Sequence, residues 1–223
     1  MASLTETQEK PKIKIYSWWR SSASARVLIT LHLKGLDYEY KEINILKGDQ
    51  FTPEFKKISP RSFVPVLVDG DVVITESTAI IQYLEERYPQ PSILPPQGEF
   101  QKRALHYQVA SMINASMQPF INIQVLKYIE EKVGAEERIP WAHIYFKKGF
   151  SALENLLKEH SGKYAIGDEV GMADVFLAPE IDGAVKLFNL DMNEFPLLKK
   201  LSDDTYHQSK PFLDAVIQSQ PDA

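Results

Sequence analysis

Residues 13–35 constrain the fold more than any other part of the chain. A short strand-like run, IKIYS at 13–17, breaks at Arg20, and an apolar helical pattern then continues to Lys34. Gly35 is a natural residue to follow the end of that helix. The sequence therefore predicts a strand that leads directly into a helix, with Ser21 and Ser22 at the junction.

This junction suits an anion. The first N–H groups of a helix have no partner within it, and the positive end of the helix dipole lies there. A thiolate is such an anion, and two hydroxyl groups stand beside it. The alternative is that Ser21 and Ser22 only cap the helix, because serine is a favoured N-cap residue.

Composition limits the kinds of protein that this chain can be. Its 223 residues can bury one sizeable core or two smaller ones, and 44% hydrophobic with 25% charged residues is typical of a soluble globular protein. A net charge of -5 argues against nucleic acid or an anionic membrane as the main partner. No apolar run is long enough to span a membrane. Residues 1–11 lack the apolar core of a secretory signal, so we expect a disordered lead and a cytoplasmic protein.

The chain contains no cysteine. This excludes disulfides, thiolate metal sites and a thiol nucleophile that belongs to the protein. Any thiol chemistry must therefore use a thiol from outside. The five histidines are scattered without a ligand-like spacing, so we expect no metal site.

The chain divides into two halves of different texture. Short strand-like and helix-like runs alternate up to residue 88, in the order βαβαββα, and they predict an α/β domain over residues 12–89. A proline-rich linker follows at 90–98. Residues 99–223 then read as an all-helical domain. Its expected helices are 100–132 with a break at Pro119, 140–160, 172–188 and 196–215.

Two further places could hold a peptide-like ligand. The Val64–Pro65 bond is a candidate cis peptide, and a proline that cannot join a strand ladder would leave the Val64 backbone free to pair with a ligand. Glu76 and Ser77 open a helix, so helix N–H groups and a carboxylate could hold the head group of an amino acid. A simple strand start and a simple capping pair are the alternatives.

Taken together and in this order, these segments resemble the glutathione transferases, and within them the plant members of the zeta class, which includes maleylacetoacetate isomerase. The resemblance covers residues 12–222. Its main carriers are the segments YSWWRSS at 16–22, KGDQF at 47–51, Val64–Pro65, Glu76–Ser77, Gln118–Pro119, Ala173–Asp174 and the closing QPD at 220–222.

The resemblance implies a glutathione transferase fold, with a thioredoxin-like N-terminal domain, an all-α C-terminal domain, a homodimer, and glutathione bound between the domains. Ser21 would then hydrogen-bond the glutathione sulfur, and Ser22 and Arg26 would complete the motif. The remaining implied contacts to glutathione or the second substrate come from Gln50, Val64, Pro65, Glu76, Ser77, Gln118 and Asn122.

The implied activity is glutathione-dependent. It is cis–trans isomerisation of maleylacetoacetate in tyrosine breakdown, or attack on α-halo acids as in detoxification, with peroxidase activity as a further option. Two positions depart from the class: Ala23 replaces a cysteine, and Leu187 replaces a basic residue, with Lys186 beside it. These departures leave open an alternative, a glutathione-binding carrier of hydrophobic ligands with little or no catalysis.

Overall fold

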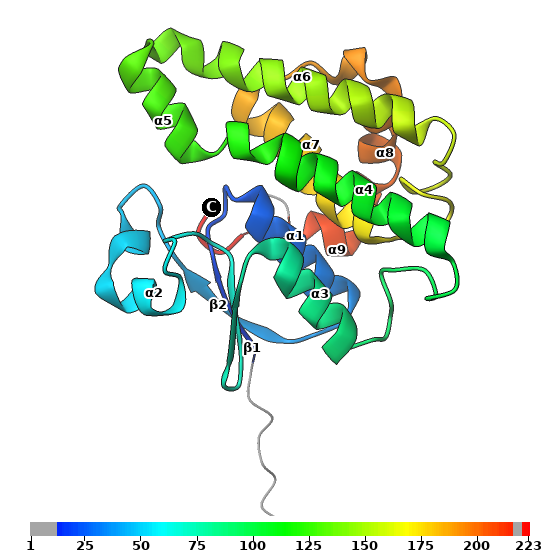
Figure 1. The fold of residues 1–223 in the computed structure, drawn as a ribbon, viewed down its shortest axis with the longest axis horizontal. Helices are drawn as coiled ribbons and strands as arrows, with labels where there is room; N and C mark the ends of the chain where they lie inside the picture. The colour runs from blue at the N-terminus through cyan, green and yellow to red at the C-terminus, as the bar shows by residue number, and fades with distance from the viewer. Residues whose placement is uncertain (1–12, 216–219) are drawn as a thin grey trace, which may run out of the picture.

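The computed structural model describes residues 13–215 and 220–223, so the expected disordered lead at 1–11 lies outside the described residues. The first half of the chain builds a four-stranded sheet with the strand order β2-β1-β3-β4 (Figure 1). Strand β1 is parallel to β2 and antiparallel to β3, and β3 is antiparallel to β4. In chain order the elements are β1 (Ile13–Ser17), α1 (Ser22–Leu33), β2 (Tyr38–Glu42), α2 (Pro53–Ile58), β3 (Val66–Asp69), β4 (Val72–Thr75) and α3 (Ser77–Arg87).

This order is the βαβαββα pattern that the sequence predicts. Two boundaries differ. The alternation of apolar and polar residues over 38–45 predicts a strand to residue 45, but β2 ends at Glu42. The Asn44 side chain accepts hydrogen bonds from the backbone N–H groups of Leu46 and Lys47, both at 3.1 Å, and turns the chain. The apolar run VPVLV at 64–68 predicts a strand from residue 64, but β3 starts at Val66, after the proline.

The second half of the chain is helical. Its helices are α4 (Phe100–Ser116), α5 (Ile123–Lys132), α6 (Arg138–Leu157), α7 (Met172–Phe188), α8 (Pro196–Asp204) and α9 (Lys210–Leu213). Pro119 separates α4 from α5, as expected, and lies in a short 3-10 helix. The expectation of one helix over 196–215 is wrong. Helix α8 ends at Asp204, a 3-10 turn follows at Tyr206–Gln208, and α9 starts at Lys210 with Pro211 in its first turn, where proline is tolerated but could not continue a longer helix.

Helix α7 forms the centre of the molecule. It packs against α4 and α6 in the helical half and against α1 in the sheet half, and most of its side chains are buried, Phe176 among them. Its first turn is capped by Asp174, whose carboxylate accepts hydrogen bonds from the backbone N–H of Gly171 at 2.9 Å and of Ala165 at 2.8 Å. One apolar core therefore spans both halves and fixes their relative position.

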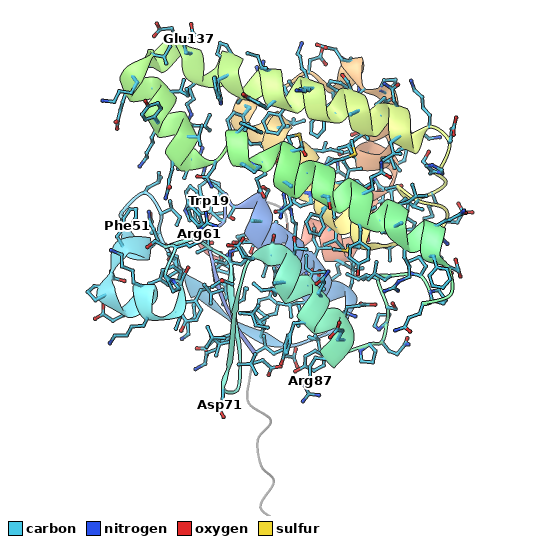
Figure 2. All side chains as sticks on the ribbon, in the orientation of Figure 1. Trp19, Phe51, Arg61, Asp71, Arg87 and Glu137 are labelled. Atoms are coloured by element: carbon cyan, nitrogen blue, oxygen red, sulfur yellow. The ribbon has the colours of Figure 1, made fainter. Side chains whose placement is uncertain are left out.

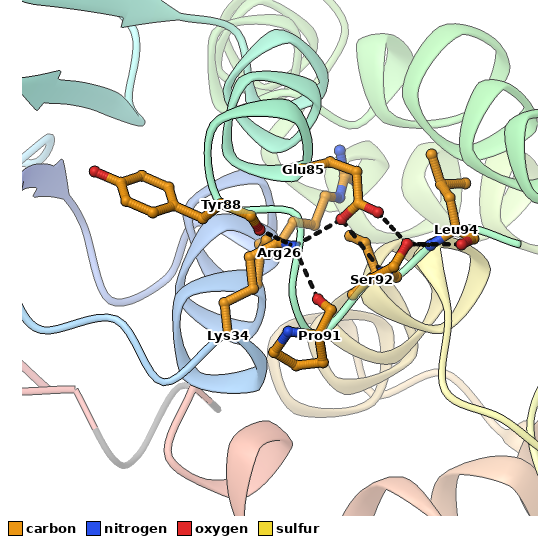
Figure 3. A network of polar contacts seen from close by, with 9 residues as sticks. Arg26, Lys34, Glu85, Tyr88, Pro91, Ser92 and Leu94 are labelled. Carbon is orange, nitrogen blue, oxygen red and sulfur yellow. Dashed lines mark hydrogen bonds and ion pairs between the residues drawn. The ribbon is translucent and has the colours of Figure 1, made fainter. Parts of the chain in front are cut away.

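A buried lysine joins the end of α1 to the segment between the halves. The ammonium group of Lys34 donates to the carbonyl oxygens of Tyr88 at 2.8 Å and Pro91 at 2.9 Å, and it pairs with Glu85 at 2.7 Å (Figure 3). Glu85 in turn accepts a hydrogen bond from the backbone N–H of Ile93 at 3.2 Å. These contacts hold the proline-rich segment against the sheet half. No helix within residues 13–215 and 220–223 is long and apolar enough to cross a membrane.

Candidate functional site

A cavity of about 1060 Å³ lies between the sheet half and the helical half. Trp19 and Arg61 lie on its sheet side, below helix α5 (Figure 2). Of the ten site residues that the sequence predicts, only Arg26 does not line it. The other nine are Ser21, Ser22, Gln50, Val64, Pro65, Glu76, Ser77, Gln118 and Asn122.

Ser21 is the N-cap residue of α1. Its hydroxyl oxygen accepts a hydrogen bond from the backbone N–H of Ser24 at 3.1 Å. The capping alternative is therefore correct for this side chain, but it does not exclude the functional one. Accepting a bond leaves the hydroxyl proton available, so Ser21 can donate to a ligand that lies at the start of the helix.

Ser22 is held by the helical half. Its hydroxyl oxygen accepts a hydrogen bond from the side-chain amide of Gln118 at 2.8 Å, and its hydroxyl proton interacts with the carboxylate of Glu180. Both hydrogen-bonding functions of Ser22 are thus used within the protein. Ser21 is the better placed of the two hydroxyl groups to donate to a bound thiolate.

Arg26 lies behind the serine pair and is fully buried. Its guanidinium donates to Asn114 at 3.1 Å, to Gln118 at 2.9 Å and to Glu180 at 2.8 Å, and it lies 4.8 Å from the centre of the Phe176 ring. Burial lowers the pKa of Arg26 and raises the pKa of Glu180, although each group stabilises the charge of the other. This network joins α1 to α4 and α7, and Arg26 reaches the cavity through its partners Asn114, Gln118 and Glu180, which line it.

The Val64–Pro65 peptide bond is cis, as the sequence predicts. The ladder between β1 and β3 pairs Tyr16 with Val66 at its last position. Among the described residues we find no backbone hydrogen bond to Val64, which is only partly buried. Its N–H and C=O groups are therefore free to pair with a peptide-like ligand in the cavity.

Glu76 and Ser77 lie at the start of α3. Glu76 has a φ of 69° and a ψ of 116°, a backbone conformation that residues other than glycine rarely adopt. Its carboxylate makes no capping hydrogen bond, is 59% exposed and lies 3.9 Å from the Arg61 guanidinium. The strained backbone directs this carboxylate away from the helix, so a simple capping role does not account for Glu76.

Gln50 supplies a buried polar atom that lacks a partner. Its side-chain nitrogen donates to the carbonyl oxygen of Ile45 at 3.3 Å, whereas its side-chain oxygen is buried and has no hydrogen bond within the described part of the chain. An unpaired buried acceptor is unfavourable unless a ligand satisfies it. Together with the free backbone of Val64, it fits a ligand that carries amide N–H groups, as a peptide does.

Two arginines that the sequence analysis did not single out also face the cavity. Arg20 lies over the rings of Trp18 and Trp19, 5.8 Å and 5.4 Å from their centres. Arg138, at the start of α6, pairs with Glu130 at 3.0 Å, and its Nε is buried without a hydrogen bond among the described residues. Burial, and then the charge of Arg138, lower the pKa of Arg20. Arg20 lies within the YSWWRSS segment and Arg138 lies in no motif, so only the folded structure brings the two arginines together.

The two departures from the zeta pattern also lie at the cavity. Ala23 and Leu187 both line it. Lys186, beside Leu187, forms an ion pair with Asp182 one turn earlier at 2.7 Å. Lys186 does not line the cavity, whereas Arg20 and Arg138 do and are cationic groups available to a second substrate.

Comparisons with known proteins agree with this geometry. The family described as "Glutathione S-transferase, N-terminal domain" matches residues 15–92, and "Glutathione S-transferase, C-terminal domain" matches residues 117–210. A zeta-class glutathione S-transferase of Euphorbia esula is 52% identical over 100% of this chain and 97% of its own length. The chain belongs to the zeta class of the glutathione transferases.

Relatives named for an isomerase reaction support the same placement. Maleylacetoacetate isomerase of Rattus norvegicus is 43% identical, over 84% of this chain and 85% of its own. A solved maleylacetoacetate isomerase of Methylobacterium extorquens AM1, with bound malonate and glutathione, has a TM-score of 0.89 and 32% identity. The match covers 94% of this chain and 99% of the solved chain.

This zeta-class chain is therefore an enzyme with glutathione-dependent isomerase or transferase activity, and the non-catalytic carrier is not favoured. Its cofactor is glutathione, as in the solved relative that holds it. The cavity fits this tripeptide in two respects: the Val64 backbone is free, and the buried oxygen of Gln50 lacks a partner. No group of residues that could hold a metal is found within the described ranges.

Proposed function

We propose that this enzyme isomerises maleylacetoacetate or dehalogenates α-halo acids, and that its second substrate carries a carboxylate. One observation carries this proposal: a single cavity joins Ser21, at the start of α1, to the arginines Arg20 and Arg138. The first group can stabilise an anionic sulfur, and the other two can hold a carboxylate. The malonate bound in the solved isomerase from Methylobacterium extorquens is a dicarboxylate, which supports this choice of substrate class.

Glutathione, when bound, supplies the thiolate that attacks the second substrate. Ser21 donates its hydroxyl proton to the sulfur, and the N-terminus of α1 adds its dipole. A free thiol has a pKa of about 8.5, and each unit by which it is lowered needs about 1.4 kcal/mol. One charge-assisted hydrogen bond and a helix dipole together supply roughly 2–3 kcal/mol, enough for a drop of about two units.

The rest of the tripeptide is held by the sheet half. The backbone of Val64, beside the cis Pro65, pairs with the cysteinyl unit as an added strand would. Glu76 binds the ammonium group and Ser77, at the start of α3, the carboxylate of the γ-glutamyl end. Gln50 binds the glycine end by accepting a hydrogen bond from the glycyl N–H with its unpaired side-chain oxygen.

The helical half supports and completes the site. Gln118 holds the Ser22 hydroxyl at 2.8 Å, and Arg26 holds Gln118 at 2.9 Å. Arg26 and Ser22 therefore act by positioning the start of α1. Asn122, the N-cap residue of α5, lines the cavity on the acceptor side and is placed to contact the second substrate.

Three further features belong to this proposal. We divide the chain into a glutathione-binding domain at 12–89, a linker at 90–98 and an acceptor-binding domain at 99–223.

We expect a homodimer, and exposed apolar side chains such as Phe51 (52% exposed) and Phe100 (78% exposed) provide surface for it. Static light scattering measures this. We also expect the enzyme to be cytoplasmic, which localisation of a tagged full-length chain tests.

A panel of substrates tests the proposed activity. The enzyme is assayed with glutathione and, in turn, a maleylacetoacetate analogue, dichloroacetate and cumene hydroperoxide. We expect turnover of the first two and at most weak peroxidase activity. Retention on immobilised glutathione without turnover of any substrate would contradict the proposal and support the alternative of a glutathione-binding carrier.

A pair of variants tests the serine assignment. Ser21→Ala should raise the pKa of the bound glutathione thiol, seen in the pH dependence of thiolate absorbance, and reduce kcat strongly while glutathione affinity changes less. Ser22→Ala is the matched control, because its hydroxyl is already bonded to Gln118. If Ser22→Ala raises the thiol pKa and Ser21→Ala does not, Ser22 is the activating residue.

A further inference from the structure

The last residues of the chain lie against the turn that carries the serine motif. One carboxylate oxygen of Asp222 accepts a hydrogen bond from the backbone N–H of Trp19 at 3.1 Å, and the other accepts one from the Tyr40 hydroxyl at 2.6 Å. Figure 1 shows the C-terminus beside the start of α1. Asp222 thus connects the end of the chain to β2 and to the approach to α1.

The Trp19 N–H lies at a sensitive place in this turn. The backbone N–H of Ser21 donates to the carbonyl oxygen of Trp18 at 2.9 Å and closes the turn. Trp19 is the second residue of the turn, and its N–H has no partner inside the turn. The Asp222 carboxylate is that partner, and because it is a charged acceptor the hydrogen bond is of the stronger kind. The bonded N–H lies two residues before Ser21.

The tail that carries Asp222 is itself held in place. The side-chain amide of Gln220 donates to the carbonyl oxygen of Asp214 at 3.0 Å, just after α9, and Gln220 is buried. The backbone N–H of Ala223 donates to the carbonyl oxygen of Gln220 at 3.1 Å. Burial and the bond to Asp222 raise the pKa of Tyr40, which therefore remains a donor at neutral pH. The Asp222 carboxylate is thus fixed from two sides.

We propose that Asp222 is a positioning residue for thiol activation: it fixes the turn at Trp19 and thereby sets the position of the Ser21 hydroxyl. This inference rests on the proposed role of Ser21. Asp222 does not line the cavity, so it acts through the backbone of the turn and not by touching glutathione. Displacements of about 1 Å at a reacting group can reduce rates by up to roughly a hundredfold, so a loose turn would weaken activation.

The test uses the full-length enzyme with Asp222→Ala. We expect the pKa of the bound glutathione thiol to rise by about one unit and kcat at neutral pH to fall roughly threefold, with little change in KM for glutathione. Asp222→Asn keeps one oxygen acceptor and should show a smaller rise, which also provides a folded variant if the alanine protein is unstable. Asp204→Ala, at an exposed position at the end of α8, is the matched control and should leave both values unchanged.

Melting temperature and thiol pKa together separate the outcomes. A lower melting temperature with wild-type thiol pKa and kcat in both Asp222 variants would mean that the tail is only structural, and would overturn this inference. If Ser21→Ala raises the thiol pKa and neither Asp222 variant does, the proposed function stands and the inference alone fails. If Ser21→Ala itself leaves the thiol pKa unchanged, the proposed activation fails and this inference with it.

Discussion

The Arg26 guanidinium and the Glu180 carboxylate lie 2.8 Å apart, with side chains that are 0% and 2% exposed. Arg26 belongs to α1 and Glu180 to α7, so this ion pair joins the sheet half to the helical half. Removing one partner of a buried pair leaves an uncompensated charge, and that loss exceeds the net contribution of the intact pair.

We therefore expect Arg26→Ala to lower the free energy of unfolding by about 3–5 kcal/mol, measured by urea denaturation. The double variant Arg26→Met with Glu180→Leu should recover a substantial part of this loss, because no unpaired charge remains. A loss below about 1 kcal/mol for Arg26→Ala would show that water or a shifted side chain compensates Glu180.

The strained backbone of Glu76 allows binding to be separated from folding. Its φ of 69° costs on the order of 1–3 kcal/mol in a residue other than glycine. Glu76→Gly should therefore fold at least as stably as the wild type, yet raise the KM for glutathione roughly tenfold, because the carboxylate for the ammonium group is lost. Calorimetry and steady-state kinetics measure the two effects. Reduced stability with unchanged KM would assign Glu76 a structural role only.

Arg20 and Arg138, the two arginines at the cavity, should favour substrates that carry carboxylates. Arg138→Ala is expected to raise KM for a dicarboxylate substrate roughly tenfold and to leave the KM for glutathione and the thiol pKa unchanged. Lys132→Ala is the control, since Lys132 is exposed and does not line the cavity. If both variants raise this KM equally, Arg138 contributes only general charge attraction. Added salt would then weaken the effect of both variants to the same extent.

A buried histidine should make stability depend on pH. His106 accepts a hydrogen bond from the backbone N–H of Ala173 at 3.2 Å, and burial, with Lys102 and Arg103 nearby, lowers its pKa to about 4. The unfolded chain, with a pKa near 6.5, binds this proton first. Stability from the neutral ring is therefore complete above pH 6.5 and is lost as the pH falls towards 4.

The matched variant is His106→Gln, which cannot titrate. We expect the stability difference between the wild type and this variant to shrink by about 2–3 kcal/mol between pH 7 and pH 4. Taking the difference cancels groups with the opposite trend, such as Asp174, whose pKa burial raises to about 6. A difference that stays constant with pH would mean that His106 titrates in the folded state as it does in the unfolded chain.

Local patterns explain how much of this protein the sequence could predict. The order of strands and helices follows from apolar periodicity and from Gly35, Pro89 and Pro119, which act over a few residues. The cis bond at Pro65 was a candidate because proline permits the cis form, and the structure has it. The prediction of one helix over 196–215 was wrong. Apolar periodicity continues through this segment, whereas α8 ends at Asp204 and α9 begins at Lys210.

Contacts between distant residues could not be predicted from local patterns. Arg26 carries a family motif, but its partners Asn114 and Glu180 are 88 and 154 positions away and have no spacing that marks them. The approach of Arg138 to Arg20 and the bond from Trp19 to Asp222 likewise depend on the packing of whole helices. The sequence could name residues that the fold brings to one cavity, whereas Arg138 and the supporting contacts could be found only from the fold.

The last prediction concerns Ala23, which lines the cavity in the first turn of α1, next to Ser22. Alanine cannot ionise or donate a hydrogen bond, whereas the cysteine of the zeta pattern could help to orient the second substrate and could form a mixed disulfide with glutathione. Activation by Ser21 does not depend on position 23. We therefore expect Ala23→Cys to raise isomerisation, which requires a well-oriented addition and elimination, by more than it raises dehalogenation. It should also introduce inactivation that a reducing agent reverses. Both activities are measured in both proteins, with Ala23→Ser as the control for size and polarity. An equal change in the two activities, or none, would mean that this position only packs.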